Sequence, residues 1–349
     1  MSMNISKHSD KVYIIIHGYF GFGNVGDEAI LSVIIDEFKK LFKNVEFVVL
    51  SCNPSRTSKL HGVKAIRERL TSLSFWKTFI RSHILVLAGG GRYGYATWRR
   101  MALLALLAKL LGKVVIFKGI GVYPYEWKGR PVISEKPVAF KGLTGLLTRL
   151  AISKAFHISV RDKYSYAVLR LTGVKRSIDI EKDLAFRLKL PDPSECRELA
   201  IKYNIREGRV LGVNLRTLDA ETSEKVVNYV VKLVRGFMEK GFDKVVFIPF
   251  GFGSFRGRFF DNDLIVAFKL KSRVPNLIII NEELNPKEIL CLFNYLDYVV
   301  AMRHHAVIFT LLAKKPILAL VYDTKTLELL RMLSRDDTNI TLVLVNNLM

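Results

Sequence analysis

The chain has 349 residues, half of them hydrophobic, and this length suits two α/β domains better than one. Lys and Arg number 54 against 32 Asp and Glu, so the formal net charge of +22 favours an anionic partner. Because no long basic tract or nucleic-acid-binding motif is present, we expect an anionic membrane face or a phosphorylated or acidic saccharide, and no nucleic acid.

The three cysteines, Cys52, Cys196 and Cys291, are far apart and lack metal-ligand spacing, so we expect reduced thiols in a cytoplasmic protein. The first residues contain no apolar signal core. The most apolar segment, 101–122, is interrupted by three lysines. It therefore predicts a buried helix followed by a buried strand, not a membrane span.

Strands and helices alternate through the first half of the chain. A glycine loop separates the first strand from the first helix, and Gly21, Gly23 and Gly26 fit G-x-G-x-x-G. Apolar runs predict strands at 11–17, 45–50, 84–88, 113–118, 157–160 and 177–180, and amphipathic stretches predict helices at 27–42, 97–111, 143–155 and 163–171.

The glycine loop resembles a dinucleotide-binding turn, but two observations argue against NAD(P). The next strand is followed by 51–53, Ser-Cys-Asn, where a ribose-binding acid is expected. Asp27 and Glu28 would also face a pyrophosphate on this helix. We therefore expect no cofactor; the alternative is a tight turn that requires glycine. A second run, Gly89–Gly91, suits close approach of either a ligand or another strand.

The second half repeats the pattern after a proline-containing linker at 190–194. We predict two Rossmann-like doubly wound α/β domains, 1–189 and 190–349, facing across a cleft. The predicted strands are 210–215, 244–248, 277–280, 298–301, 317–321 and 341–345; the predicted helices are 195–203, 223–240, 262–271, 286–293, 304–313 and 326–333.

Basic residues follow strands at positions where parallel sheets bind ligands. Arg303 and His305 lie between the strand 298–301 and the next helix, and Lys325 follows the strand 317–321. The carboxyl edge of a sheet and a helix N-terminus together suit a small, multiply charged anion. The alternative is structural: Arg303 in an ion pair, a histidine capping the helix and Lys325 in solvent.

The ordered motifs resemble the polysaccharide pyruvyl transferase family. They are the glycine loop with N-V-G-D-E at 24–28, G-G-G at 89–91, S-V-R-D at 159–162, M-R-H-H at 302–305 and Y-D-T-K at 322–325. The resemblance implies a GT-B-like fold with the site between its domains. It also implies transfer of pyruvate from phosphoenolpyruvate, as co-substrate, to a sugar, usually as a cyclic ketal.

The resemblance assigns donor-binding and catalytic roles to Arg161, Arg303, His305 and Lys325. The family more often has an aliphatic residue where this chain has His304, so which histidine faces the site stays open. It usually has proline where this chain has Thr324.

The chemistry suits these residue types, since arginines bind carboxylate and phosphate bidentately and histidine is an acid at neutral pH. We predict that Arg161 and Arg303 bind the donor, His305 is the general acid and Lys325 binds phosphate or carries a proton. Arg216, at another strand end, is a further donor contact. We expect no metal.

Asn24, Asp27 and Glu28 offer hydrogen-bond acceptors to sugar hydroxyls, so we predict that they face a saccharide acceptor; the alternative is a capped helix start. The net charge suits an acceptor on a lipid phosphate at the inner membrane face, with peripheral contact to anionic lipid. A GT-B glycosyltransferase using a nucleotide sugar is the main rival function. A saccharide- or membrane-surface-binding protein without activity is the non-enzymatic rival.

Overall fold

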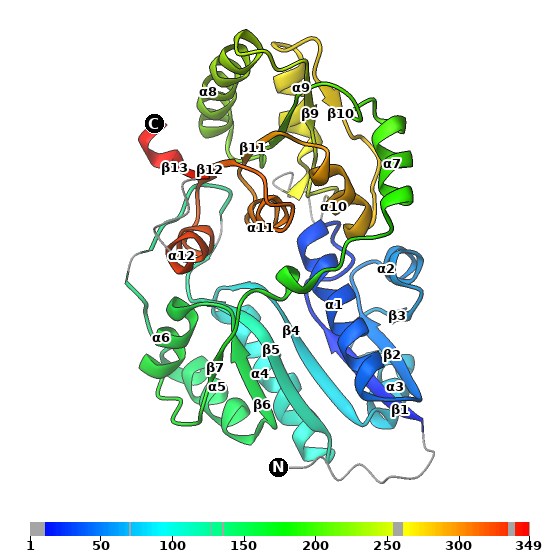
Figure 1. The fold of residues 1–349 in the computed structure, drawn as a ribbon. Coiled ribbons are helices and arrows are strands. Elements are labelled where there is room, and N and C mark those ends of the chain that lie inside the picture. Colours follow the sequence, from blue (N-terminus) through cyan, green and yellow to red (C-terminus); the bar gives the residue numbers. More distant parts are fainter. Residues whose placement is uncertain are drawn as a thin grey trace.

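Two parallel β-sheets form the molecule, one from each half of the chain (Figure 1). The computed structural model describes residues 11–69, 71–126, 128–134, 136–253, 261–333 and 339–348. The N-terminal sheet has the order β3-β2-β1-β4-β5-β6-β7 and the C-terminal sheet the order β10-β9-β8-β11-β12-β13. Both are doubly wound, which confirms the predicted fold class.

The N-terminal sheet is covered by helices on both faces. Ile14 and Ile16 of the central strand face α1 and the C-terminal half, whereas Ile15 faces α3, α4, α5 and α6. The strands are β1 (Val12–His17), β2 (Val45–Leu50), β3 (Lys64–Ile66), β4 (Ile84–Tyr93), β5 (Val114–Tyr123), β6 (His157–Val160) and β7 (Asp179–Ile180). The helices are α1 (Val25–Leu41), α2 (Pro54–His61), α3 (Leu73–Arg81), α4 (Tyr95–Leu110), α5 (Gly142–Lys154) and α6 (Lys163–Leu171).

A short 3-10 helix, η1 (Leu184–Arg187), joins the first sheet to the second half. The predicted boundary between residues 189 and 190 falls between the two sheets and stays a prediction. The strands are β8 (Val210–Asn214), β9 (Lys244–Phe247), β10 (Ile278–Ile279), β11 (Tyr298–Ala301), β12 (Ile317–Val321) and β13 (Ile340–Leu344). The helices are α7 (Pro193–Lys202), α8 (Ala220–Glu239), α9 (Leu264–Lys271), α10 (Pro286–Asn294), α11 (His304–Leu312), α12 (Thr324–Met332) and the 3-10 helix η3 (Val345–Leu348).

Most predicted elements lie within a few residues of their observed positions, but β4 is longer than expected. It continues through Gly89–Gly91 and stays paired with β5, so the packing alternative explains these glycines. A Cβ on Gly89 would lie 2.5 Å from the Gly119 carbonyl oxygen. The sequence did not predict α2, β3 and α3, which are short and follow one another without long apolar runs.

The predicted reduced state of the cysteines is wrong for two of them. Cys196 of α7 and Cys291 of α10 form a disulfide, with their Cα atoms 4.8 Å apart. The two helices pack against each other, so the pairing depends on tertiary contact between residues 95 positions apart in the chain. Sequence spacing alone does not reveal it.

The two halves are joined at the glycine loop and at a connection that crosses from the first sheet. The Val25 amide donates to the Phe250 carbonyl at 3.0 Å, and Phe252 donates to Gly23 at 2.9 Å. After β5, the chain reaches the C-terminal half, where Val132 donates to the Tyr322 carbonyl at 2.8 Å. Among the described residues, no helix is long and apolar enough to cross a membrane.

Candidate active site

The site is organised at the N-terminus of α11, where the two halves meet. β11 ends at Ala301, and Arg303 adopts an extended backbone at the N-cap of α11. The Arg303 amide donates to the Asn214 side chain at 3.0 Å. His304 and His305 therefore form the first turn of the helix, as predicted, and both side chains are buried.

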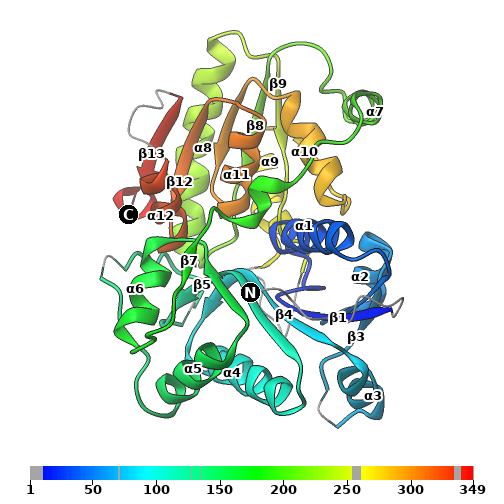
Figure 2. The ribbon, with the colours of Figure 1, turned by 60° about the horizontal axis from the view of Figure 1, so that its bottom comes forward.

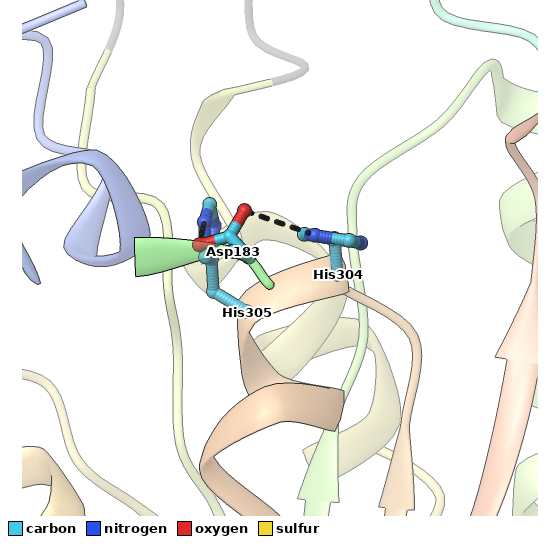
Figure 3. Close-up of side chains that lie close together, drawn as sticks. All are labelled: Asp183, His304 and His305. Atoms are coloured by element: carbon cyan, nitrogen blue, oxygen red, sulfur yellow. Dashed lines mark ion pairs between the residues drawn. The ribbon is translucent and has the colours of Figure 1, made fainter. Parts of the chain in front are cut away.

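Asp183 reaches both histidines from the other half of the chain. It caps η1, and its Oδ1 accepts the Ala185 amide at 3.0 Å. Its Oδ2 lies 3.4 Å from the His304 Nε2, and its Oδ1 lies 3.8 Å from the His305 Nε2. Figure 3 shows the carboxylate between the two rings. One buried acid thus links two adjacent histidines.

Burial lowers the pKa of both imidazoles, and neighbouring positive charge acts in the same direction. Burial lowers the pKa of His304, and the neighbouring Arg161 lowers it further. Burial also lowers the pKa of His305 well below its ordinary value, with Asp183 opposing the shift. For Asp183, burial acts to raise the pKa, but contact with His304 and the charges of His305 and Arg161 lower it well below its usual range.

Arg161 extends this cluster from the end of β6. Its Nη1 donates to the Asp183 Oδ2 at 3.0 Å and its Nη2 to the Tyr123 hydroxyl at 3.2 Å. Asp162 caps α6 and lies 3.6 Å from the Arg161 Nε. Among the described residues, Arg161 Nε, both ring nitrogens of His304 and the His305 Nε2 are buried without a hydrogen-bond partner. Such atoms mark a place where a ligand can bind.

Lys325 lies in the first turn of α12 and is largely buried, so the solvent-exposed alternative is wrong for this residue. Its Nζ is 3.4 Å from Asp323, which caps α12. Burial lowers the pKa of Lys325, and Asp323 opposes this shift. A small pocket beside the cluster is lined in part by Arg161, His304 and Lys325. Arg161 and Lys325, two of the predicted site residues, thus lie together, and the histidine that lines this pocket is His304 rather than His305, the predicted general acid.

Arg303 and Arg216 are each held by an acid. Arg303 makes two hydrogen bonds with Asp263, at 2.7 and 2.6 Å, which is the predicted ion-pair alternative. Arg216 donates to the Tyr322 hydroxyl at 3.0 Å and to Asp261 at 3.1 Å. Their direct contact with a donor stays a prediction.

The glycine loop packs against the site and joins the halves. A Cβ on Gly26 would lie 1.8 Å from the His305 Nδ1, so only glycine lets this ring lie against α1. Asn24 caps α1, accepting the amides of Gly26 and Asp27, which is the capped-helix alternative. Acceptor binding by Asn24, Asp27 and Glu28 stays a prediction, and Asn24 has a structural function as the cap of this helix.

Glu28 and Asp27 differ in what they contact. Glu28 is buried, accepts the Gly21 amide at 2.8 Å and lies 2.8 Å from the His61 Nε2. Asp27 packs close to Gly90, where a Cβ would lie 2.3 Å from the Asp27 Oδ1. Asp27 also raises the pKa of Lys325, so it is electrostatically connected to the cluster. Of the three predicted acceptor residues, Asp27 is the best placed.

A metal ion fits the cluster poorly. The ligand atoms of Asp183, His304 and His305 lie within 4.8 Å of one another, which is close enough for shared coordination. However, Arg161 donates to the Asp183 oxygen nearest His304, and Lys325 adds a second positive charge beside the cluster. These cations disfavour a further cation.

Sequence reasoning missed the acids that hold the basic residues. In the sequence, Asp183 follows the last predicted strand of the first half, and no local pattern gives it a role. Asp183, Asp263 and Asp323 each lie at the start of a helix or turn that follows a strand. The position of these acids at helix starts could have marked them in the sequence. Their basic partners could not be identified, because most of these lie in distant parts of the chain.

Solved structures define the class to which this fold belongs, the GT-B-like proteins with two Rossmann-like domains. UDP-GlcNAc 2-epimerase from Methanocaldococcus jannaschii is 12% identical with a TM-score of 0.58, over 96% of this chain and 89% of that one. Anabaena Alr3699/HepE, solved with UDP, is 11% identical with a TM-score of 0.54, over 97% and 89%. At these identities the likeness shows the fold alone.

The family follows from the sequence match. The model of the polysaccharide pyruvyl transferase family matches residues 24–324, and the chain belongs to this family. The matched range begins within the glycine loop, includes Arg161, Asp183 and the His304–His305 pair, and ends just before Lys325. A search of curated proteins gave no significant match.

Proposed function

We propose that the protein transfers a pyruvyl group from phosphoenolpyruvate to hydroxyls of a saccharide, forming a ketal in glycan biosynthesis. The observation that carries this proposal is the set of buried nitrogens on Arg161, His304 and His305 that lack hydrogen-bond partners among the described residues. They lie beside Lys325, next to a pocket. Family membership supplies the reaction class.

The donor carries a carboxylate and a phosphate close together, and the cluster offers matching donors. Arg161 presents a planar guanidinium whose Nη1 and Nη2 atoms are held by Asp183 and Tyr123, which fixes its orientation and leaves the buried Nε without a hydrogen-bond partner in the described part of the chain. Lys325 supplies a point charge for phosphate. Arg303 and Arg216 contribute positive charge at the same sheet edge, while Asp263 and Asp261 hold their side chains in place.

The reaction needs one proton delivered to carbon. In our proposal His305 protonates the methylene carbon, and a saccharide hydroxyl oxygen bonds to the adjacent carbon. A second hydroxyl oxygen then displaces phosphate and closes the ketal. Of the two protons lost by the hydroxyls, one restores the acid and the other leaves with phosphate, so the step balances. The carboxylate of Asp183, whose Oδ1 lies 3.8 Å from the His305 Nε2, stabilises the charged form of the imidazole.

Protonation of His305 depends on the donor. In the free protein, burial keeps the pKa of this histidine well below its ordinary value. A bound anion adds negative charge and favours the protonated form. Donor binding near pH 6.5 is therefore expected to take up a proton, which calorimetry in buffers of different ionisation enthalpy measures directly.

On the acceptor side, we propose that Asp27 accepts a hydroxyl of the saccharide. Its carboxylate belongs to α1, which packs against α11, so it approaches the cluster from the opposite half. An acceptor carried on a lipid phosphate would suit the net charge of +22. Asn24 and Glu28 would support the same loop through the contacts already described.

The testing experiment measures thermal stability with phosphoenolpyruvate, inorganic phosphate, UDP-sugars, GDP-sugars and NAD. A ligand at a hundred times its dissociation constant adds about 2.7 kcal/mol to the free energy of unfolding. We expect phosphoenolpyruvate to raise the melting temperature and Lys325→Gln to reduce that rise. The exposed Lys232→Gln on α8 is the matched control and should keep it.

The second candidate is a glycosyltransferase with a nucleotide-sugar donor, because structures of the same fold were solved with UDP or UDP-sugars. A melting shift with a UDP-sugar and none with phosphoenolpyruvate would favour that function and overturn the first proposal.

A further inference from the structure

The outer side of the N-terminal sheet is covered by four helices, α3, α4, α5 and α6, which we call the outer layer. Their buried side chains pack on the sheet face opposite the one that carries α1 and the C-terminal half. Figure 2 shows α3, α4 and α5 on the side of the sheet away from the second half, and α4 and α5 contact each other. α3, α4 and α5 therefore lie on the face away from the active-site cluster, whereas α6 begins directly after Arg161 and Asp162.

The four helices of the outer layer contain bases but no acids, although Arg100 of α4 is paired with Glu68, which lies outside these helices. The outer layer holds two basic residues in α3, three in α4, two in α5 and two in α6, and none of these helices contains Asp or Glu. By contrast, α1 on the other face contains both acids and bases. The side chains of Lys77, Arg99, Arg149, Lys154 and Lys163 are exposed. Their charge is thus presented to solvent.

Large apolar side chains lie among these bases on the exposed surface. Leu73 of α3 is 88% exposed and Leu110 of α4 is 85% exposed. In α5, Leu146 and Leu150 are exposed beside Arg149. The outward face of a helix in a globular protein is normally polar, and exposed leucines among lysines and arginines are typical of a helix that binds an interface.

We propose that the outer layer docks onto an anionic lipid bilayer surface. Leucines would enter the interfacial region while lysines and arginines meet lipid phosphates, the pattern of interfacial helices. A second copy of this chain is disfavoured because two acid-free basic faces repel. Nucleic acid would use the bases but leave the leucines in water. The outer layer would be the surface that makes the membrane contact named in the proposed function. Docking through it does not depend on pyruvyl transfer.

The test is co-sedimentation of the full chain with vesicles of phosphatidylcholine alone or with 30% phosphatidylglycerol added. We expect binding to the anionic vesicles only, weakening as salt rises. The triple variant Lys77→Gln, Arg149→Gln and Lys154→Gln should bind on the order of a hundredfold more weakly at low salt, since each charge contributes about fivefold. Its control, Lys232→Gln, Arg235→Gln and Lys240→Gln, loses the same charge from the C-terminal half and should bind nearly normally.

A second pair of variants tests the apolar contribution. Leu110→Ser with Leu146→Ser should weaken binding by about tenfold or more. Ile201→Ser with Phe268→Ser removes comparably exposed side chains from α7 and α9 and should have little effect.

The docking proposal would be overturned if the protein did not bind anionic vesicles, or if both triple variants lost vesicle binding equally. It would also be overturned if replacing the leucines left vesicle binding unchanged. Dimerisation through this face in sedimentation would also do so. The melting shift with phosphoenolpyruvate is measured separately, so failure of docking is distinguishable from failure of the proposed reaction.

Discussion

The active-site cluster and the outer layer differ in how their basic residues are paired with acids. In the cluster, four basic residues each contact an acid: Arg161 with Asp183, Arg216 with Asp261, Arg303 with Asp263 and Lys325 with Asp323. In the outer layer, nine bases occur in helices without a single acid. The large net charge therefore does not come from the cluster itself.

A basic composition can therefore contain two kinds of basic residue, buried and exposed. Buried cations need carboxylates, because an unpaired charge in the interior costs several kcal/mol. The paired charges of the cluster hold side chains in defined orientations for a small anion. Exposed cations on the outer layer need no partner within the protein, so they remain available to an extended anionic surface.

The largest expected effect comes from Asp183→Asn, which keeps the shape of the side chain but removes its charge. Arg161 would lose its buried partner, and both histidines would lose the acid between them. We expect phosphate release to fall by about 10³-fold and the free energy of unfolding to fall by about 3 kcal/mol. Assays of turnover and urea unfolding measure both. Asp179→Asn, which alters an exposed carboxylate on β7, is the control and should behave as wild type.

The second largest effect on turnover distinguishes the roles of His304 and His305. If His305 is the general acid, His305→Gln should lower turnover by about 10²- to 10⁴-fold. His304→Gln changes the neighbouring ring in the pocket and should act mainly on the KM for the donor. A larger loss of turnover in His304→Gln would assign the acid to His304 instead.

Stability should depend on pH through the same pair. The unfolded chain takes up protons on these histidines near their ordinary pKa of 6.5, whereas the folded pKa values are lower. The free energy of unfolding should therefore fall as pH drops below about 6.5, by about 1.4 kcal/mol for each unit of pKa depression. Urea unfolding at pH 7.5 and 5.5 measures this, and His305→Gln should flatten the difference. The lowered pKa of Asp183 acts in a separate window, below its ordinary value of 3.8.

The smallest expected effect concerns the exposed bases of the outer layer. The outer-layer triple variant should change the free energy of unfolding by less than about 0.5 kcal/mol, because its three side chains are exposed. Its turnover with a water-soluble acceptor should be unchanged. A substantial loss of either quantity would show that these bases contribute to the fold or the site.

Thr324 departs from the family pattern, and the tertiary structure shows which contacts this threonine makes. The family usually has proline at this position. Here the Thr324 amide donates to Val132 at 3.2 Å, and its hydroxyl accepts the Ser134 amide at 2.7 Å. Proline would remove both contacts with the crossing connection. The sequence identified the departure, but its consequence depends on a segment far away in the chain.

The alternation of strands and helices, the fold class and the family were all predicted from the sequence and are confirmed. Apolar runs and helix boundaries are local, so β6, α6, β11 and β12 were predicted at their observed bounds. The positions of Arg161 and His305 at carboxyl edges also followed from local order and the parallel-sheet rule.

Which side chains come into contact depends on the packing of the elements against one another. This packing placed Asp183 between His304 and His305, put the His305 ring against Gly26, and joined Cys196 to Cys291. It also gathered acid-free helices from separate segments into one outer layer. These contacts join residues distant in the chain, and a local pattern fixes the faces of an element but not the neighbour that it meets. The physical reason is that packing between elements, rather than propensity within them, selects partners.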